Sequence, residues 1–223
     1  MYVNEFDNNS QICLQMCRNP TVSYFSECYN TYDFDRFTAF PALRIAVIQV
    51  LLKGDGDMIR EAKISDAARI AAIEVASCRF AYKDIVPEKY LFDDLTAESR
   101  IPSVERWISE KRFELYVYED PDTGAVNGMM GIGRCEDEDK ENAFELHFIY
   151  VDPDHLRAGI GSEMLLFFEQ KGKERGFEEF VIWVLEENQL GKSFYEKHNY
   201  SSDGKEKIFR RWNKREIRYV KGS

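Results

Sequence analysis

The stretch that decides the fold runs from residue 145 to residue 166 and reads ELHFIYVDPDHLRAGIGSEMLL. Its first half has the apolar residues of a strand on both faces, so we expect both faces to be covered. After a proline turn, Gly159-Ile160-Gly161 opens a helix. Glycines let a ligand approach the backbone closely, and the free N–H groups at a helix N-terminus bind anions. This stretch therefore predicts a pyrophosphate-binding loop between a central strand and a helix.

The chain around this stretch, from Met58 onwards, alternates strand and helix patterns. We expect Ser65 to cap the first helix, with Asp66 in its first turn. Further helices are predicted at residues 87–91, 103–110, 162–173 and 189–198. Strands are predicted at residues 58–62, 113–118, 126–134, 143–151, 180–185, 207–212 and 216–220. The order of these elements predicts an α/β (α+β) protein with helices packed on a mixed sheet.

The first 57 residues differ in character from the rest. They are rich in Asn, Tyr, Phe and Cys, with one convincing helical stretch between Phe40 and Leu52. We therefore divide the chain into an extension, residues 1–57, and a catalytic domain, residues 58–223. The extension is expected to be translated upstream sequence or a loosely attached segment, whose deletion leaves activity and melting temperature nearly unchanged.

Charge and apolar patterning exclude several classes of function. A formal net charge of -10 argues against non-specific nucleic-acid binding, which depends on Lys and Arg neutralising phosphates. The basic tail from Lys205 to Lys221 is a local exception, most simply a solvated strand pair. The longest apolar stretch, Phe37 to Leu52, is too short and too polar to cross a membrane. We expect a protein without a membrane segment, located in the cytoplasm.

Cysteine usage agrees with a reducing compartment. The five cysteines are odd in number and irregularly spaced, so they do not form a disulfide framework. Cys13, Cys17 and Cys28 lack a nearby histidine to complete a metal site, and we expect no metal. Cys78 and Cys135 are expected to be ordinary buried cysteines.

The predicted pyrophosphate loop resembles a known family. Val151-Asp152-Pro153 and Gly159-Ile160-Gly161-Ser162 are similar to the loop of the GNAT superfamily of acyl-CoA-dependent N-acetyltransferases. Leu156 stands where that family has Gln or Arg, and the arginine comes one place later, at Arg157. The backbone contribution is independent of that side chain, whereas Arg157 either reaches a phosphate or faces solvent. The resemblance implies that the cofactor loop consists of Arg157, Ala158, Gly159, Ile160, Gly161 and Ser162.

A second segment, Asn188 to Tyr200, resembles the family's Asn-(x)6-Tyr-Glu-Lys-x-Gly-Phe motif, with Asn199 at the usual glycine. The resemblance covers residues 58–220. It implies a twisted, mostly antiparallel sheet of about six to seven strands flanked by about four helices. It also implies that Asn188 bonds the pantetheine arm of acetyl-CoA and that Tyr195 faces the thioester. Dimers are common among such proteins, so a homodimer is possible.

The resemblance also implies roles in acyl transfer. Glu145, a carboxylate within an apolar strand, would be the general base, and the competing interpretation is a structural ion pair. His147 lies on the same strand face and could assist, although a satisfied core histidine is favoured. Tyr195 would protonate the leaving thiolate, unless it only fills the core. A backbone N–H of Ile149, Tyr150 or Val151, where the family has a strand bulge, would stabilise the oxyanion.

These residues predict an N-acetyltransferase that moves acetyl from acetyl-CoA to a primary amine by direct attack in a ternary complex, since no Ser-His-Asp or Cys-His arrangement stands out. The acceptor, a small-molecule or peptide amine, stays open. Five aromatic residues either line its pocket or, as favoured, pack in the core: Phe80, Tyr82, Tyr90, Phe92 and Trp107. The alternatives are a non-catalytic CoA-binding sensor and, more weakly, a nucleotide-phosphate binder.

Overall fold

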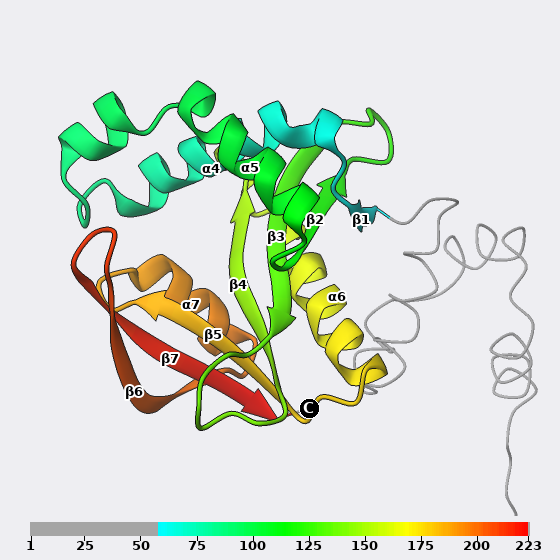
Figure 1. The fold of residues 1–223 in the computed structure, drawn as a ribbon, viewed down its shortest axis with the longest axis vertical. Coiled ribbons are helices and arrows are strands. Elements are labelled where there is room, and N and C mark those ends of the chain that lie inside the picture. Colours follow the sequence, from blue (N-terminus) through cyan, green and yellow to red (C-terminus); the bar gives the residue numbers. More distant parts are fainter. Residues whose placement is uncertain (1–57, 223) are drawn as a thin grey trace, which may run out of the picture. The chain divides into compact units, whose positions relative to one another are not determined.

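The computed structural model describes residues 58–222 (Figure 1). The predictions made for residues 1–57, including the division after residue 57 and those for Cys13, Cys17 and Cys28, lie outside the described residues. They stay predictions.

A seven-stranded sheet runs through the described part of the chain (Figure 1). Its order is β1-β2-β3-β4-β5-β7-β6, and each neighbouring pair is antiparallel except β4–β5. The strands are β1 (Ile59–Glu61), β2 (Glu114–Glu119), β3 (Val126–Arg134), β4 (Ala143–Val151), β5 (Glu179–Leu185), β6 (Ser201–Phe209) and β7 (Lys214–Gly222). The expected mixed, mostly antiparallel sheet of six to seven strands is confirmed.

Four α-helices flank this sheet, as the resemblance implied. They are α4 (Ala67–Tyr82), α5 (Ala97–Glu110), α6 (Ile160–Glu174) and α7 (Gln189–Lys197). Short 3-10 turns η3 (Ile64–Asp66) and η5 (Pro153–His155) precede α4 and α6, and a π-helical segment η4 (Tyr90–Asp94) precedes α5.

The helices bury two different faces of the sheet. Helices α4 and α5 cover the face of β2 and β3 that carries Leu115, Val117 and Met129. Helix α6 covers the other face, where Met164 and Phe168 pack in one cluster with residues of β4 and β5. Because β4 lies between these two layers, its apolar residues on both faces are used, as its sequence predicted.

Strands β4 and β5 pair over only part of their length. Their parallel ladder runs from Ala143↔Glu179 to Leu146↔Ile182, although β4 continues to Val151. Figure 1 shows the two strands separating beyond this point. The far half of β4 therefore has a neighbour only on its β3 side, and a gap opens inside the sheet.

The bulge in β4 is not where the resemblance placed it. The β3–β4 register shifts between Gly131↔Phe148 and Ile132↔Leu146, so His147 is the extra residue on β4. The bulge thus precedes the expected Ile149–Val151 stretch, whose pairing with β3 is regular. Gly131 permits this geometry, because a Cβ there would come within 2.6 Å of the Phe148 ring.

Three local predictions were wrong. Ser65 does not cap α4; instead the carboxylate of Asp66 accepts a hydrogen bond from the backbone N–H of Lys63 at 2.7 Å. Helix α5 begins at Ala97, capped by Thr96, and continues through Pro102. Strand β6 ends at Phe209, so Trp212 lies in the turn before β7 rather than in a strand.

Candidate functional site

A cleft of about 1460 Å³ follows the gap between β4 and β5. It is lined by the loop before α6, by α4 and α5, and by the β6–β7 turn. The predicted site residues that line it are Glu145, Ile149, Tyr150, Val151, Arg157, Gly159, Ile160, Gly161, Ser162, Asn188 and Tyr195. Of the predicted set, Ala158 alone is exposed beside the cleft without lining it. We call the part around α6 and α7 the cofactor end, and the part around α4, α5, the loop of residues 136–142 and the β6–β7 turn the acceptor end.

The loop before α6 has the backbone shape that an anion site requires. Gly159 lies in the left-handed region, with φ +92°, and its carbonyl accepts hydrogen bonds from the N–H groups of Ser162 and Glu163. The N–H groups of Ile160 and Gly161 come before these bonds and point out of the helix end, since a helix start leaves its first N–H groups without intrahelical partners. Arg157, also left-handed at φ 66°, is exposed and lines the cleft with Lys197. The cofactor end therefore combines main-chain donors with positive charge.

Glu163 lies in the same turn, and sequence reasoning missed it. One oxygen of its carboxylate, Oε2, is buried and without a hydrogen-bond partner among the described residues. Burial raises the pKa of Glu163, opposed by the hydroxyl of Tyr118. A Cβ on Gly159 would lie 3.7 Å from its Oε1 atom, so this carboxylate is beside the anion loop. An acidic residue in a first helical turn is ordinarily interpreted as a partner of the helix dipole, so the sequence did not mark Glu163 as a candidate site residue.

His198 supports the loop from α7. Its Nε2 lies 3.0 Å from the Oγ of Ser162, and Phe194 packs against its ring at 4.8 Å. Burial lowers the pKa of His198, so its imidazole is neutral near pH 7. His198 was expected only as the end of a helix, because nothing in its local sequence points to a residue 36 positions earlier.

Glu145 and His147 form a pair on one face of β4. Their Oε1 and Nδ1 atoms are 3.1 Å apart, and the Glu145 side chain is 12% exposed. His147 also packs against Phe113 at 5.5 Å. The absent side chain of Gly133 leaves room for it, since a Cβ there would meet its Nε2 at 3.1 Å. The expected sharing of a strand face is confirmed, and His147 can pass a proton to or from Glu145.

Tyr195 lines the opposite wall of the cleft from α7. The residue is 7% exposed, and burial raises its pKa well above the ordinary value, so the phenol keeps its proton. Tyr195 also packs in the core cluster of α6, β4 and β5, as the competing interpretation expected, but among residues 58–222 its hydroxyl has no hydrogen bond to backbone. A buried, neutral phenol is suited to donating a proton.

Asn188 caps helix α7. Its Oδ1 accepts a hydrogen bond from the N–H of Gly191 at 3.0 Å, and the residue is 8% exposed. The side-chain oxygen is thus occupied within the protein. Its amide nitrogen is the group left for a ligand in the cleft.

The unpaired edge of β4 offers backbone donors to the gap. Asp152 donates its N–H to the carbonyl of Asn127 on β3, at 2.9 Å. Because antiparallel pairing alternates, Tyr150 also faces β3, whereas the N–H groups of Ile149 and Val151 face away from it. The Oγ of Ser77 donates to the Val151 carbonyl at 2.9 Å, which agrees with that direction.

The acceptor end is closed by aromatic residues from distant segments. Trp212 of the β6–β7 turn packs against Tyr82 at 5.1 Å and Tyr90 at 6.0 Å. Of the five aromatic residues proposed for this region, Phe80, Tyr82 and Trp107 line the cleft. Tyr90 packs in the core, and Phe92 is 47% exposed. Tyr82 and Trp107 also pack against core clusters, so they fit both alternatives, whereas Phe92 fits neither.

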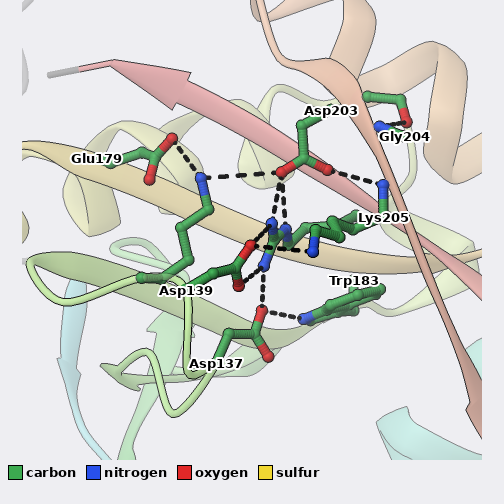
Figure 2. Close-up of polar contacts among 10 residues, drawn as sticks. Asp137, Asp139, Glu179, Trp183, Asp203, Gly204 and Lys205 are labelled. Atoms are coloured by element: carbon green, nitrogen blue, oxygen red, sulfur yellow. Dashed lines mark hydrogen bonds and ion pairs between the residues drawn. The ribbon is translucent and has the colours of Figure 1, made fainter.

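Arg218 of β7 holds the loop of residues 136–142 through ion pairs with Asp137 and Asp139. Figure 2 shows these two carboxylates and Asp203 pointing toward one another beside Trp183. The Arg218 side chain is 3% exposed and contacts Asp137, Asp139 and Asp203. The Oδ2 of Asp137 accepts hydrogen bonds from Arg218 at 2.9 Å and from the indole of Trp183 at 3.1 Å. Because Asp137 and Trp183 both line the cleft, this ion network holds one wall of the acceptor end.

The two described cysteines, Cys78 and Cys135, are free and buried. Burial raises the pKa of each thiol to about 12, so neither is a ready nucleophile. Within residues 58–222 there is no group of three or more His, Cys, Asp or Glu side chains placed to hold a metal ion. No helix in the described chain is long and apolar enough to span a bilayer.

Comparison with known proteins agrees with this geometry. Residues 79–200 match the Acetyltransferase (GNAT) family. The chain is 30% identical over 130 residues to the uncharacterized N-acetyltransferase YuaI of Bacillus subtilis, covering 58% of this chain and 72% of YuaI. It is 28% identical over 147 residues to the spermidine N(1)-acetyltransferase of Thermoplasma acidophilum, covering 64% of this chain and 86% of that one.

The fold is similar to that of a solved structure, the PaiA N-acetyltransferase from Thermoplasma acidophilum in complex with coenzyme A. The TM-score is 0.56 at 20% identity, covering 72% of this chain and 96% of the other.

Proposed function

Because this chain belongs to the GNAT acetyltransferase family and is an acyl-CoA-dependent N-acetyltransferase, we propose that it acetylates a primary amine by direct attack in a ternary complex. The observation that carries this mechanism is the gap beside β4, with main-chain donors at one end and the Glu145–His147 pair at the other. One cleft can thus hold the thioester and the amine together.

In this proposal the diphosphate of acetyl-CoA lies on the N–H groups of the α6 start, with Gly159 allowing close approach. The pantetheine arm extends along the free edge of β4 beside Ile149 and Val151. Asn188 donates from the opposite wall through its amide nitrogen. The residues that support this placement all line the cleft.

The chemistry needs an uncharged amine, because an alkyl ammonium has no free electron pair. Glu145, whose Oε1 lies 3.1 Å from the Nδ1 of His147, accepts the proton that the ammonium loses. The nitrogen then forms a bond to the thioester carbon, and the N–H groups of Ile149 and Val151 stabilise the oxyanion. When the C–S bond breaks, Tyr195 donates its proton to the sulfur of CoA. The amide nitrogen releases its second proton to solvent, and solvent returns a proton to Tyr195.

Two substitutions test the catalytic assignment. Glu145→Gln is expected to lower kcat about 100- to 1000-fold, and Tyr195→Phe about 10- to 100-fold. CoA affinity, measured by calorimetry, should change less than twofold in both, because neither group binds the diphosphate. Normal turnover in Glu145→Gln would contradict the general-base role.

The alternatives give different results. A CoA-binding sensor would bind CoA yet consume no acetyl-CoA with any member of a broad amine panel. A nucleotide-phosphate binder would show ATP competing with CoA in a thermal-shift assay. The panel should include polyamines, since one relative is a spermidine N(1)-acetyltransferase.

We also propose that residues 58–223 are the catalytic domain, since they include the whole family match and the cleft. A chain lacking residues 1–57 is expected to keep its melting temperature and its kcat. Loss of folding on truncation would refute this division.

A further inference from the structure

Two hydrogen-bond donors at the acceptor end are buried and without partners among the described residues. They are Nη2 of Arg100 on α5 and Nε1 of Trp212 in the β6–β7 turn, and both residues line the cleft. Buried donors in proteins are nearly always paired, so each unpaired one needs an explanation. Both groups can only donate, which points to a ligand rich in acceptor oxygens.

Arg100 is held as a fixed donor. The residue is 8% exposed, its Nε donates to Glu74 at 3.0 Å, and its guanidinium lies 5.1 Å from the ring centre of Trp107. A guanidinium carries five N–H donors, and Glu74 uses only one of them through this bond. The pair with Glu74 and the contact with Trp107 leave the other donors pre-organised for a planar anion such as carboxylate.

The two donors belong to the same end of the cleft. Trp212 packs against the cluster that includes Cys78 and Leu95. Arg100 pairs with Glu74, which precedes Cys78 by one turn on the same helix, α4. Cys78 therefore lies near both donors.

An aromatic wall separates these donors from the proposed general base. Trp107 packs against Phe113 and Phe148, each at 5.5 Å, and Phe113 packs against His147 at 5.5 Å. His147 in turn contacts Glu145. The three aromatic residues line the cleft. A ligand that contacts both the two donors and Glu145 therefore carries an apolar segment between its polar groups.

The charges of the acceptor end balance. Apart from Arg157 and Lys197 at the cofactor end, the cleft is lined by five acidic and five basic residues: Glu74, Glu136, Asp137, Glu145 and Glu216, and Arg100, Arg112, Arg134, Lys207 and Arg211. A site for a polycation would carry an excess of carboxylates. A balanced site matches a molecule with one charge of each sign.

From this arrangement we propose that the acetylated amine belongs to a zwitterionic acceptor, whose carboxylate is bound by Arg100 and Trp212 and whose amine reaches Glu145 across an apolar spacer. This rests on the proposed acetyl transfer to a primary amine. It narrows the acceptor to amino acids or short peptides with the carboxylate several bonds from the attacked nitrogen.

Chain-matched acceptors test the proposal on the unaltered, full-length enzyme. At each of four, six and eight carbons, the ω-amino acid, the alkyl monoamine and the α,ω-diamine are compared by kcat/KM for acetyl transfer. We expect the amino acid to exceed the monoamine about 10- to 100-fold at the best length, as hydrogen bonds to a charged group imply. The diamine should not exceed the monoamine.

Two variants assign the preference to the named donors. Trp212→Phe removes the N–H and keeps a ring, and should reduce the amino acid to monoamine ratio of kcat/KM about 3- to 10-fold. Arg100→Lys keeps the charge beside Glu74 but loses Nη2, and should reduce the ratio about 10-fold or more. Arg106→Lys, on the exposed face of the same helix, is the matched control and should leave the ratio unchanged.

A carboxylate preference absent at every length, or a preference for diamines, overturns the proposal while the acetyl transfer itself stands. An unchanged ratio in Trp212→Phe and Arg100→Lys also overturns it. If Arg100→Lys fails to fold, the unaltered enzyme and Trp212→Phe still decide. Consumption of acetyl-CoA with no amine at all would instead refute the proposed function beneath it.

Discussion

The two ends of the cleft are built differently. The cofactor end uses main-chain groups from one short stretch, Val151 to Ser162, and its shape depends on the left-handed backbone at Gly159. The acceptor end uses side chains from α4, α5, the loop of residues 136–142 and the β6–β7 turn, which are far apart in the sequence. Substitutions should therefore affect the cofactor end through backbone shape, and the acceptor end through packing and charge.

The largest expected effect is at the acceptor end. Arg218→Met removes the cation shared by Asp137, Asp139 and Asp203 and leaves their carboxylates crowded together. We expect the free energy of unfolding to fall by about 3 kcal/mol, near the lower end of the range for a broken buried ion pair. Denaturant unfolding measures this loss.

Arg215→Met is the matched control, because Arg215 lies on the same strand with its side chain 50% exposed and its ion pairs open to solvent. It should lower the free energy of unfolding by no more than about 0.5 kcal/mol. Equal losses in the two variants would show that the Arg218 network adds nothing beyond a surface pair.

The next effect tests the cofactor end. Gly159→Val places a β-branched residue at φ +92°, which costs about 1–2 kcal/mol in the left-handed region. If the loop moves to relieve this strain, the Kd for CoA should rise about 10-fold in calorimetry, with the KM for the amine unchanged. Gly161→Ala should leave the melting temperature nearly unchanged, because its Cβ would be 3.5 Å from Phe194, an ordinary contact. A silent Gly159→Val would break the comparison between the two ends.

A smaller effect sharpens the comparison at the same loop. Burial raises the pKa of Glu163 above the ordinary value of a carboxyl group, and its deprotonation as pH rises would place a negative charge beside the bound diphosphate. We compare how much CoA affinity falls between pH 5 and pH 8 in the two proteins. The fall should be about threefold larger in the unaltered enzyme than in Glu163→Gln, because the repulsion of a partly solvated charge pair is modest. Identical pH profiles in calorimetry would remove Glu163 from the cofactor end.

The smallest expected effect is the pH dependence of the stability that Asp139 and Asp203 contribute. The hydrogen bond from Arg218 lowers the pKa of Asp139. Burial alone would raise the pKa of Asp203, but the hydrogen bonds from Arg218 and Lys205 and the charges of Arg218 and Lys140 together lower it. A carboxyl with a lowered folded-state pKa stabilises the fold above its unfolded pKa, about 4, and loses this contribution as pH falls further. The melting-temperature difference between the unaltered protein and Arg218→Met should therefore narrow by a few degrees from pH 7 to pH 3. A constant difference would indicate that these carboxyls do not titrate with folding.

The same comparison explains what the sequence could predict. The order of elements, the strand at residues 143–151 and the glycine loop were predictable, because period and local motif are features of adjacent residues. The caps were less so: Asp66 is recruited by the N–H of Lys63 and by Arg60, which an interpretation centred on Ser65 overlooked. Strand β6 was placed late because its first half is polar and exposed, with no apolar alternation.

The acceptor end could not be derived from sequence patterns. Arg100 and Trp212 are separated by more than a hundred residues, and only the packing of the β6–β7 turn against α4 brings them to one end of the cleft. Glu163 and His198 were missed for a related reason, since their roles depend on burial and on a partner from another helix. Such residues become visible only when long-range contacts are known.

The early separation of β4 from β5 has a mechanical consequence. With only four residue pairs joining them, the sheet contains an internal edge whose main-chain groups await a partner. An extended thioester carrier bound along that edge would occupy the place of an eighth strand. It would connect the two halves of the sheet for as long as it stays bound. The sheet around the β4–β5 gap would then become more rigid when the carrier binds and less rigid when CoA leaves.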